Sequence, residues 1–174
     1  MKNTHELIKV AMFAAITAVL SQIILPIGPV PYNLGLLGAM LAGVLCLPST
    51  ATFAMIAYIF MGAIGLPVFA GFMGGIGVLL NSTGGYLLGY IPVALLTSLA
   101  RHKKWFLTSL AMLLGLLLCY VFGTGWFMIV SQNNLVASLA YCVVPFVLPD
   151  LAKVACAILL GKAIDKRLRF INHK

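Results

Sequence analysis

Long apolar stretches run through the whole chain, separated by short polar, Pro-rich or Gly-rich segments. They occupy residues 7–25, 34–47, 51–66, 82–100, 106–130 and 137–164. Uncharged runs of this kind are typical of membrane-spanning helices, which need about 20 apolar residues to cross a hydrocarbon core of ~30 Å. The pattern therefore predicts an all-α integral membrane protein with six transmembrane helices, folded as one transmembrane domain over residues 1–174.

Two details of the pattern bear on the topology. Residues 34–47 and 51–66 are short for such a core, so they are expected either to cross as two short spans or to form a re-entrant pair. The last stretch contains Pro145 and Pro149, and proline interrupts a helix interior. We therefore expect a short outer segment first, followed by a sixth span that begins at about Asp150.

The composition agrees with a membrane protein, because 63% of the residues are hydrophobic and only 8% are charged. Soluble domains have about 25% charged residues. The four cysteines are dispersed and form no C-x-x-C pair, so neither a metal site nor a disulfide framework is predicted. No P-loop, H-E-x-x-H or G-x-S-x-G motif occurs, and we expect neither ATP binding by this chain nor an enzyme.

The net charge of +8 comes from clusters that flank the apolar stretches. Ten of the eleven Lys and Arg residues fall within residues 2–9, 101–104 and 162–174. With six spans all three clusters lie on one side of the bilayer, as the positive-inside rule requires. This predicts a multi-pass protein of the cell membrane with both termini cytoplasmic. A nucleic-acid groove would need basic residues interleaved with polar and aromatic ones, so no nucleic acid is expected as a partner.

Asp150 and Lys153 are the exceptions to this charge pattern. Of the three acidic residues, Glu6 and Asp165 accompany the cytoplasmic clusters and Asp150 does not. Lys153 is the one Lys or Arg outside the clusters. It follows Asp150 by three residues, so on a helix the two side chains share a face. An ionisable group within a span costs about 2.5–3.5 kcal/mol on insertion scales and indicates a functional site.

This pair has two interpretations. In the first, it lies at the rim of a pocket, where Asp150 accepts hydrogen bonds from a small ligand and Lys153 meets a carboxylate or carbonyl oxygen. In the second, the two side chains form a structural ion pair and only neutralise each other.

Three irregular loops, residues 26–33, 67–83 and 131–149, fall on the outer face in this topology. The first two are rich in Gly and Pro, which favour tight turns and close approach of the backbone to a ligand. Polar candidates for ligand contact are Asn81, Ser82 and Thr83; aromatic candidates for flat apolar walls are Tyr32, Tyr86 and Trp126. The alternative for each aromatic residue is a place in the interfacial aromatic belt.

Small residues four positions apart recur at Ala11 and Ala15, Ala14 and Ala18, and Gly85 and Gly89. This spacing allows helices to approach closely, either within the protein or against a partner.

Four stretches along the chain carry a family resemblance. They are P-V-P-Y-N-L at 29–34, Y-I-F-M-G-A-I-G-L-P-V-F at 58–69, S-T-G-G-Y-L-L-G at 82–89 and P-F-V-L-P-D-L-A-K at 145–153. In this order they resemble BioY, the biotin-binding substrate (S) component of energy-coupling factor (ECF) transporters for vitamins. The resemblance implies the ECF S-component fold and biotin uptake, with biotin bound near the outer face and no cofactor.

The resemblance also implies site residues and partners. Biotin's ureido ring has two N–H donors and a carbonyl, and its tail ends in a carboxylate, which suits an aspartate, an amide and a lysine. The ligand-binding residues implied are Asp150, Lys153, Asn81, Tyr86, Gly84, Asn33 and Tyr32. The partners implied are a transmembrane coupling subunit and two ATPase subunits, reached through Ala11, Ala14, Ala15 and Ala18.

The chain departs from the family pattern in its first loop. Where the family usually has V-P-x-T-x-Q, Asn33 stands in place of Thr and Gly35 in place of Gln. An S component for a different small vitamin is therefore the alternative function. A third hypothesis, an integral membrane enzyme, would rest on Asp150 as the only carboxylate at membrane depth, without a partner for a catalytic dyad.

Overall fold

The computed structural model describes residues 4–25 and 32–172, with side chains as far as residue 164. Within that part the chain forms eight helices and one pair of two-residue strands. The elements are α1 (Thr4–Ser21), β1 (Ile24–Leu25), β2 (Tyr32–Asn33), α2 (Gly35–Leu45), α3 (Pro48–Ala63), α4 (Ile76–Leu80), α5 (Gly84–Leu99), α6 (Trp105–Ser131), α7 (Leu135–Cys142) and α8 (Val144–Asn172). The predicted helical fold is confirmed.

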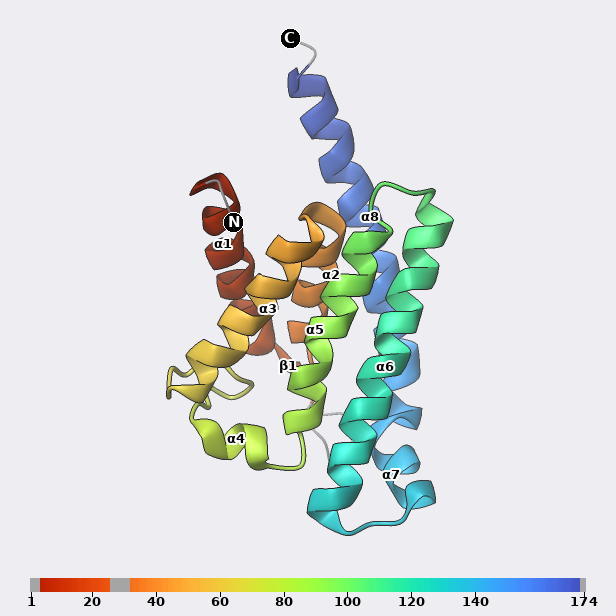
Figure 1. Cartoon of the computed structure of the whole chain (residues 1–174). Coiled ribbons are helices and arrows are strands. Elements are labelled where there is room, and N and C mark those ends of the chain that lie inside the picture. The colour runs from red at the N-terminus through yellow and green to blue at the C-terminus, as the bar shows by residue number, and fades with distance from the viewer. Residues whose placement is uncertain (1–3, 26–31, 173–174) are drawn as a thin grey trace.

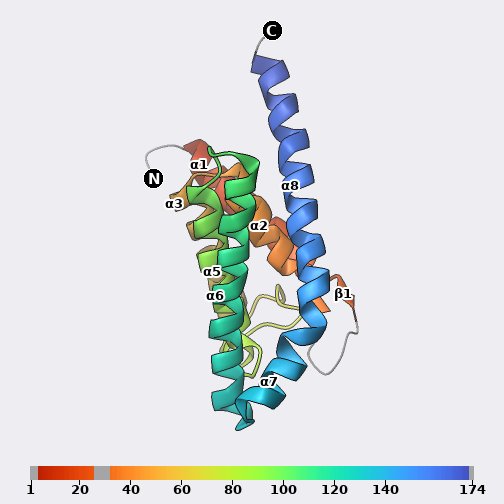
Figure 2. The ribbon, with the colours of Figure 1, turned by 90° about the vertical axis from the view of Figure 1, so that its right-hand side faces the viewer.

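The helices form an elongated bundle with two different ends (Figure 1). The start of α1, the turn between α5 and α6 and the end of α8 lie at one end, and α4 and α7 lie at the other. Turned by 90°, the bundle shows α8 along one side, extending past the other helices (Figure 2). The two ends correspond to the predicted basic side and the predicted loop-rich side.

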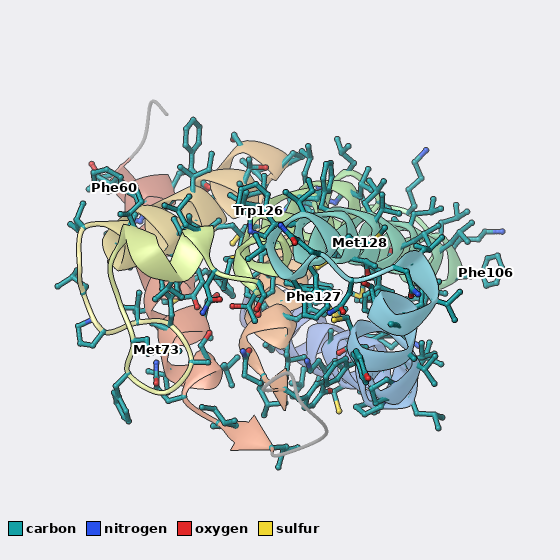
Figure 3. All side chains as sticks on the ribbon, turned by 90° about the horizontal axis from the view of Figure 1, so that it is seen from below. Phe60, Met73, Phe106, Trp126, Phe127 and Met128 are labelled. Atoms are coloured by element: carbon teal, nitrogen blue, oxygen red, sulfur yellow. The ribbon has the colours of Figure 1, made fainter. Side chains whose placement is uncertain are left out.

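Apolar side chains cover the outside of the bundle. Seen from the end that carries α4 and α7, Phe60 and Phe106 point away from the helices, and both are more than half exposed (Figure 3). On α6 most leucines are exposed, whereas Leu116 and several small or polar residues face inward, which suits a helix with one side toward lipid. The inward residues of α6 are Thr108, Met112, Gly115, Leu116, Cys119, Gly123, Thr124 and Phe127.

Three helices are long and apolar enough to cross a membrane: α1, α6 and residues Val144–Ile164 of α8. The other apolar helices, α2, α3 and α5, have 11, 16 and 16 residues. At 1.5 Å per residue these three helices are about 16–24 Å long, which agrees with the short second and third segments expected from the sequence.

Helices α5 and α6 pack closely through glycines. A Cβ atom at Gly89 would lie 2.9 Å from the Cα of Cys119, and one at Gly115 would lie 2.8 Å from the Cα of Val93. A Cβ at Gly85 would lie 2.4 Å from the Cβ of Trp126. The prediction that Gly85 and Gly89 allow close helix contact is confirmed, and the contact is within the chain.

The predicted start of the last span at Asp150 is wrong. Helix α8 begins at Val144, after the short outer segment that forms α7. Pro145 occupies the first turn of α8, where a backbone N–H has no partner within the helix, so proline is tolerated there. Pro149 lies inside the helix and does not end it. Asp150 is therefore about two turns into α8 instead of at its beginning.

Strands β1 and β2 were not predicted. They pair antiparallel, with Ile24 opposite Asn33 and Leu25 opposite Tyr32. Two-residue strands are too short to show an alternating pattern. The loop between them, residues 26–31, lies outside the described residues, as do Lys2 and Lys174 of the basic clusters.

Glycine packing between α5 and α6 generates a prediction about stability. In Gly85→Ala the new methyl group would meet Trp126 Cβ and the Phe122 carbonyl oxygen at 2.4 and 2.7 Å, and neither can rotate away. Overpacking of this kind costs about 1–3 kcal/mol, so the midpoint of thermal unfolding in detergent should fall by several degrees. Gly125→Ala on α6 is the control, because its Cβ would meet nothing within 4 Å. Equal midpoints for the two variants would contradict this packing.

Candidate ligand-binding site

A cavity lies between α2, α5, α6 and α8, in the half of the bundle that carries α4, α7 and the strands. The cavity volume is about 110 Å³, whereas a single water molecule needs about 10–15 Å³. The cavity therefore has room for a small organic ligand. It is lined by Tyr32, Asn33, Leu36, Phe69, Ala70, Met73, Val78, Thr83, Tyr86, Leu87, Tyr90, Cys119, Tyr120, Cys142, Phe146, Asp150 and Lys153.

Asp150 and Lys153 form a buried ion pair in this cavity. Lys153 Nζ lies 2.9 Å from Asp150 Oδ1, and each side chain is only 5% exposed. Tyr120 on α6 donates a hydrogen bond of 2.6 Å to the other carboxylate oxygen, Oδ2. Both carboxylate oxygens are thus held by protein, Oδ2 by the Tyr120 hydroxyl and Oδ1 by the Lys153 ammonium. Each carboxylate oxygen has more than one lone pair, so Oδ1 can still accept a further hydrogen bond from a ligand.

Lys153 also binds β2, just before α2 begins. Its ammonium group donates a hydrogen bond of 2.7 Å to the backbone carbonyl of Asn33 and lies 3.8 Å from the centre of the Tyr32 ring. The face of an aromatic ring attracts a cation, so Tyr32 stabilises the charge of Lys153. Tyr32 stacks in turn on Phe146, with ring centres 5.6 Å apart. Burial, and after it the charge of Asp150, raises the pKa of Tyr32, so the phenol stays protonated.

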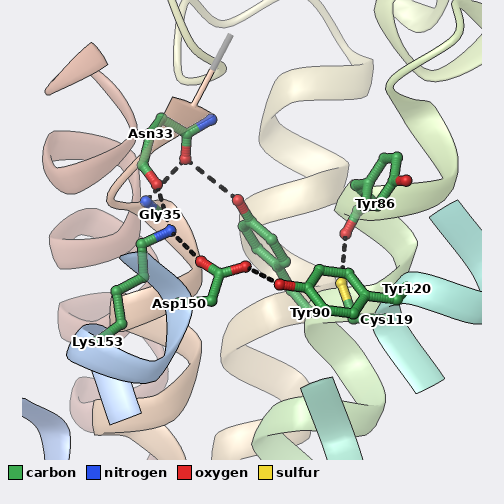
Figure 4. Close-up of polar contacts among 8 residues, drawn as sticks. All are labelled: Asn33, Gly35, Tyr86, Tyr90, Cys119, Tyr120, Asp150 and Lys153. Atoms are coloured by element: carbon green, nitrogen blue, oxygen red, sulfur yellow. Dashed lines mark hydrogen bonds and ion pairs between the residues drawn. The ribbon is translucent and has the colours of Figure 1, made fainter. Parts of the chain in front are cut away.

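Asn33 has its side-chain oxygen committed to the protein. Oδ1 accepts hydrogen bonds from Gly35 N at 2.8 Å and from Tyr90 OH at 3.2 Å (Figure 4). A side chain at position 35 would collide here, because a Cβ would lie 2.3 Å from Ser21 Oγ and 2.9 Å from Asn33 Oδ1. Glycine at 35 therefore leaves room for the Ser21 hydroxyl and the Asn33 side chain, so the two departures from the family pattern are in direct contact. The Asn33 amide nitrogen takes part in none of the contacts drawn in Figure 4.

The opposite wall is formed by α5, α6 and α7. Tyr86 shares a hydrogen bond of 3.0 Å with Thr124, and Cys119 donates from its thiol to the Tyr86 carbonyl at 3.6 Å. Leu87 adds apolar surface to this wall, and Phe69 and Met73 add apolar surface from the segment between α3 and α4. The cavity thus combines one charged polar corner with a largely apolar remainder, as ligand pockets commonly do.

The structure brings five of the seven ligand-binding candidates together: Asp150, Lys153, Tyr86, Asn33 and Tyr32 line the cavity. Asn81 and Gly84 do not. The Asn81 side chain is exposed and accepts from Ser82 N at 2.7 Å, while its carbonyl accepts from Trp126 Nε1 at 3.0 Å. A Cβ at Gly84 would collide with the Leu79 carbonyl, so glycine there allows the tight turn into α5. Thr83 lines the cavity, whereas Ser82 and Trp126 do not.

Sequence reasoning missed several lining residues, above all Tyr90 and Tyr120. Both lie on long apolar helices, where a single tyrosine is hard to tell from an interfacial residue. One usable signal existed: Tyr86 and Tyr90 are four residues apart on one helix and so share a face. Tyr120 has no such partner in the sequence, and only folding brings it to Asp150.

The four alanines of α1 face different surroundings. Ala11 and Ala15 are exposed, Ala18 is half-buried, and Ala14 is buried in the chain's own core. Ala11 and Ala15 thus form an exposed strip of small residues on α1.

The arrangement suits recognition of a small molecule. The Lys153 ammonium lies within hydrogen-bond reach of the Asp150 carboxylate and of the Asn33 backbone carbonyl, beside apolar and aromatic walls. Within the described residues no group of three or more His, Cys, Asp or Glu could hold a metal ion. The fold and the site together define a helical membrane protein with a ligand cavity in one half of the bundle.

Comparison with known proteins identifies the family. The model of the BioY family matches residues 1–170, and the chain belongs to this family. It is 38% identical over 163 residues to the probable biotin transporter BioY of Pyrococcus horikoshii, covering 94% of this chain and 98% of that protein. It is 35% identical over 167 residues to the biotin transporter BioY of Thermotoga maritima, covering 93% and 96%. These names describe transporters, which agrees with the prediction that the chain is not an enzyme.

A solved structure gives the same result at the level of the fold. The chain is similar to the crystal structure of the S component for biotin from an ECF-type ABC transporter, with a TM-score of 0.85 and 28% sequence identity. The match covers 95% of each chain. The predicted ECF S-component fold is confirmed.

The hydrogen bond to Asp150 generates a prediction. Tyr120→Phe removes a donor to a buried carboxylate, which should cost about 1.5–3 kcal/mol. Tyr86→Phe removes a hydrogen bond to a neutral hydroxyl, and such bonds in membrane proteins average about 0.6 kcal/mol. Thermal unfolding in detergent should therefore show the larger fall in midpoint for Tyr120→Phe. The reverse order would mean that Tyr120 does not support the carboxylate.

Proposed function

We propose that this protein takes up biotin, as the substrate-binding S component of an ECF-type ABC transporter. It captures biotin outside the cell with high affinity and delivers it inward when coupled to ATPase partners. The observation that carries this proposal is the buried Asp150–Lys153 pair in the ligand cavity of a chain that belongs to the BioY family.

Biotin fits the polar corner of the cavity. A ureido N–H can donate to Asp150 Oδ1, the carboxylate oxygen that faces the Lys153 ammonium and has a second lone pair for a ligand. The Asn33 amide and Lys153 can donate to the ureido carbonyl or the tail carboxylate, since both are acceptors. The hydrocarbon tail and thioether ring suit the apolar and aromatic remainder of the lining.

The proposed topology has six spans in one domain, residues 1–174, with both termini cytoplasmic in the cell membrane. It is supported by the shared end of the bundle at which α1 begins, α5 connects to α6 and α8 ends. Lys9, Arg101, Lys103 and Lys104 belong to those elements, and basic residues favour the cytoplasmic side. The cavity then lies in the outer half of the bilayer.

Biotin binding to the purified protein tests the function directly. Wild-type protein should bind biotin, and both Asp150→Asn and Lys153→Ala should bind it at least about tenfold more weakly, because each loses a hydrogen bond to a charged group. Lys9→Ala is the matched control, because Lys9 forms an (i, i+3) ion pair with Glu6 in another part of the chain. Titration calorimetry measures all four proteins. Unchanged affinity in both site variants would remove the pair from the binding site.

A different small vitamin is the alternative ligand, favoured by Asn33 in place of the usual threonine. Mass spectrometry of the molecule that copurifies with the protein separates the two ligands. Recovery of biotin supports the proposal. Recovery of another vitamin would show that this vitamin, and not biotin, is the ligand.

We also propose that the exposed strip of α1 contacts the transmembrane coupling subunit, which carries the ATPase subunits. Ala11 and Ala15 are exposed and small, which permits close helix contact. Ala14 is buried in the core, so it packs within the chain and does not itself reach the coupling subunit.

Bulky substitutions test this interface. Ala11→Trp and Ala15→Trp should abolish copurification with the coupling subunit and biotin uptake, while biotin affinity of the isolated protein stays unchanged. Ala155→Trp, at an exposed alanine of α8, should leave assembly intact. Assembly of the α1 variants at the wild-type level would place the interface elsewhere.

A further inference from the structure

Gln22 makes more side-chain hydrogen bonds than its place just after α1 requires. Its Nε2 lies 3.1 Å from each of the carbonyl oxygens of Ala18, Val68 and Phe69, and its two N–H groups donate to these three acceptors, one of them shared. Its Oε1 accepts from the backbone N–H of Phe72 at 2.8 Å. Three of these four contacts reach a segment about 50 residues further along the chain. One half-buried side chain thus joins the end of α1 to residues 68–72.

The segment that Gln22 holds is a wall of the cavity. Phe69, Ala70 and Met73 all line it. Phe69 and Met73 form an isolated β-bridge, with Phe69 N donating to Met73 O at 3.0 Å. The Phe69 ring packs edge-on against Tyr58, in space that a Cβ at Gly62 would occupy.

The remainder of this segment is held weakly. Phe72 is 72% exposed and has a positive φ of 56°, a conformation that a bulky residue adopts only when its surroundings impose it. Gln22 accepts from the N–H of this residue. The amide of Gln22 therefore closes a loop whose tip has no packing of its own, and it needs both a donor and an acceptor to do so.

We propose that Gln22 is a positioning residue that fixes the cavity wall of residues 68–73 to the end of α1 and thereby slows ligand release. It touches no ligand itself, since it does not line the cavity. It acts through Phe69, Ala70 and Met73. The ligand in this proposal is that of the proposed function, whereas the position of the wall does not depend on it.

The first experiment measures biotin release. Gln22→Glu keeps the shape and the acceptor but removes the donors, and it sets a negative charge against three carbonyl oxygens. Gln22→Met keeps the length without any hydrogen bond, and it serves if the charged variant does not fold. The dissociation rate, measured by chasing labelled biotin from purified protein, should rise at least about tenfold in both variants, with a smaller change in the association rate. Gln132→Glu is the matched control, at the exposed turn after α6.

The second experiment needs no ligand. Cys119 and Cys142 line the cavity, and Cys46 is equally buried but lies outside it. A charged methanethiosulfonate reagent, with the modified cysteines identified by mass spectrometry, should label Cys119 and Cys142 faster in the Gln22 variants than in wild type. Cys46 should stay protected, because only the wall has moved.

The outcomes separate the two proposals. Faster labelling of the cavity cysteines together with faster biotin release supports the role of Gln22. Equal labelling and equal release rates in wild type and both variants overturn it. Labelling of all three cysteines also overturns it, because the substitution then loosens the whole fold. If wild-type protein binds no biotin, the proposed function fails, and the labelling still decides the role of Gln22.

Discussion

The lack of water in a bilayer is the constraint on which the rest of this structure depends. A charge there must find its partners inside the protein, because unpaired burial costs several kcal/mol. Lys153 shows the solution: carboxylate, backbone carbonyl and aromatic ring surround one ammonium group. These partners come from α8 and β2, so satisfying one charge joins elements that are distant in sequence. The charges in the cavity wall are therefore held in a network of the protein's own groups, to which a ligand can add its hydrogen bonds.

The sequence was most informative about the site because ionisable residues are rare in its apolar segments. With three acidic residues in 174, a carboxylate and an amine three positions apart in an apolar run stand out, and Asp150 with Lys153 could be found without a structure. The helical segments followed from apolar length in the same way. Tyr90 and Tyr120 could not be found, because aromatic residues are common in such helices and their role depends on which helix lies opposite. The start of α8 was misjudged because proline breaks a helix interior but suits a first turn.

Gly35 and Asn33 illustrate how local departures from a family pattern become interpretable only in three dimensions. Taken singly, each substitution suggests a changed ligand contact. In space they are coupled, since the asparagine amide uses the room that a side chain at position 35 would need. Asn81 shows the opposite case, a polar residue beside a family motif that contacts the backbone of its own turn instead of the cavity.

The glycine contacts between α5 and α6 have a consequence for selectivity. Backbones this close cannot slide or separate without losing packing along their whole length. The tyrosines and the cysteine that α5 and α6 contribute therefore form an unyielding half of the cavity. The half built from residues 68–73 is held by side-chain contacts and can adjust. A ligand group placed against the unyielding half must match its shape closely, whereas a group placed against the other half can vary in size. The protein should therefore discriminate more strongly between analogues altered on the side of α5 and α6 than between analogues altered on the side of residues 68–73. This difference originates in glycines between α5 and α6 that touch no ligand.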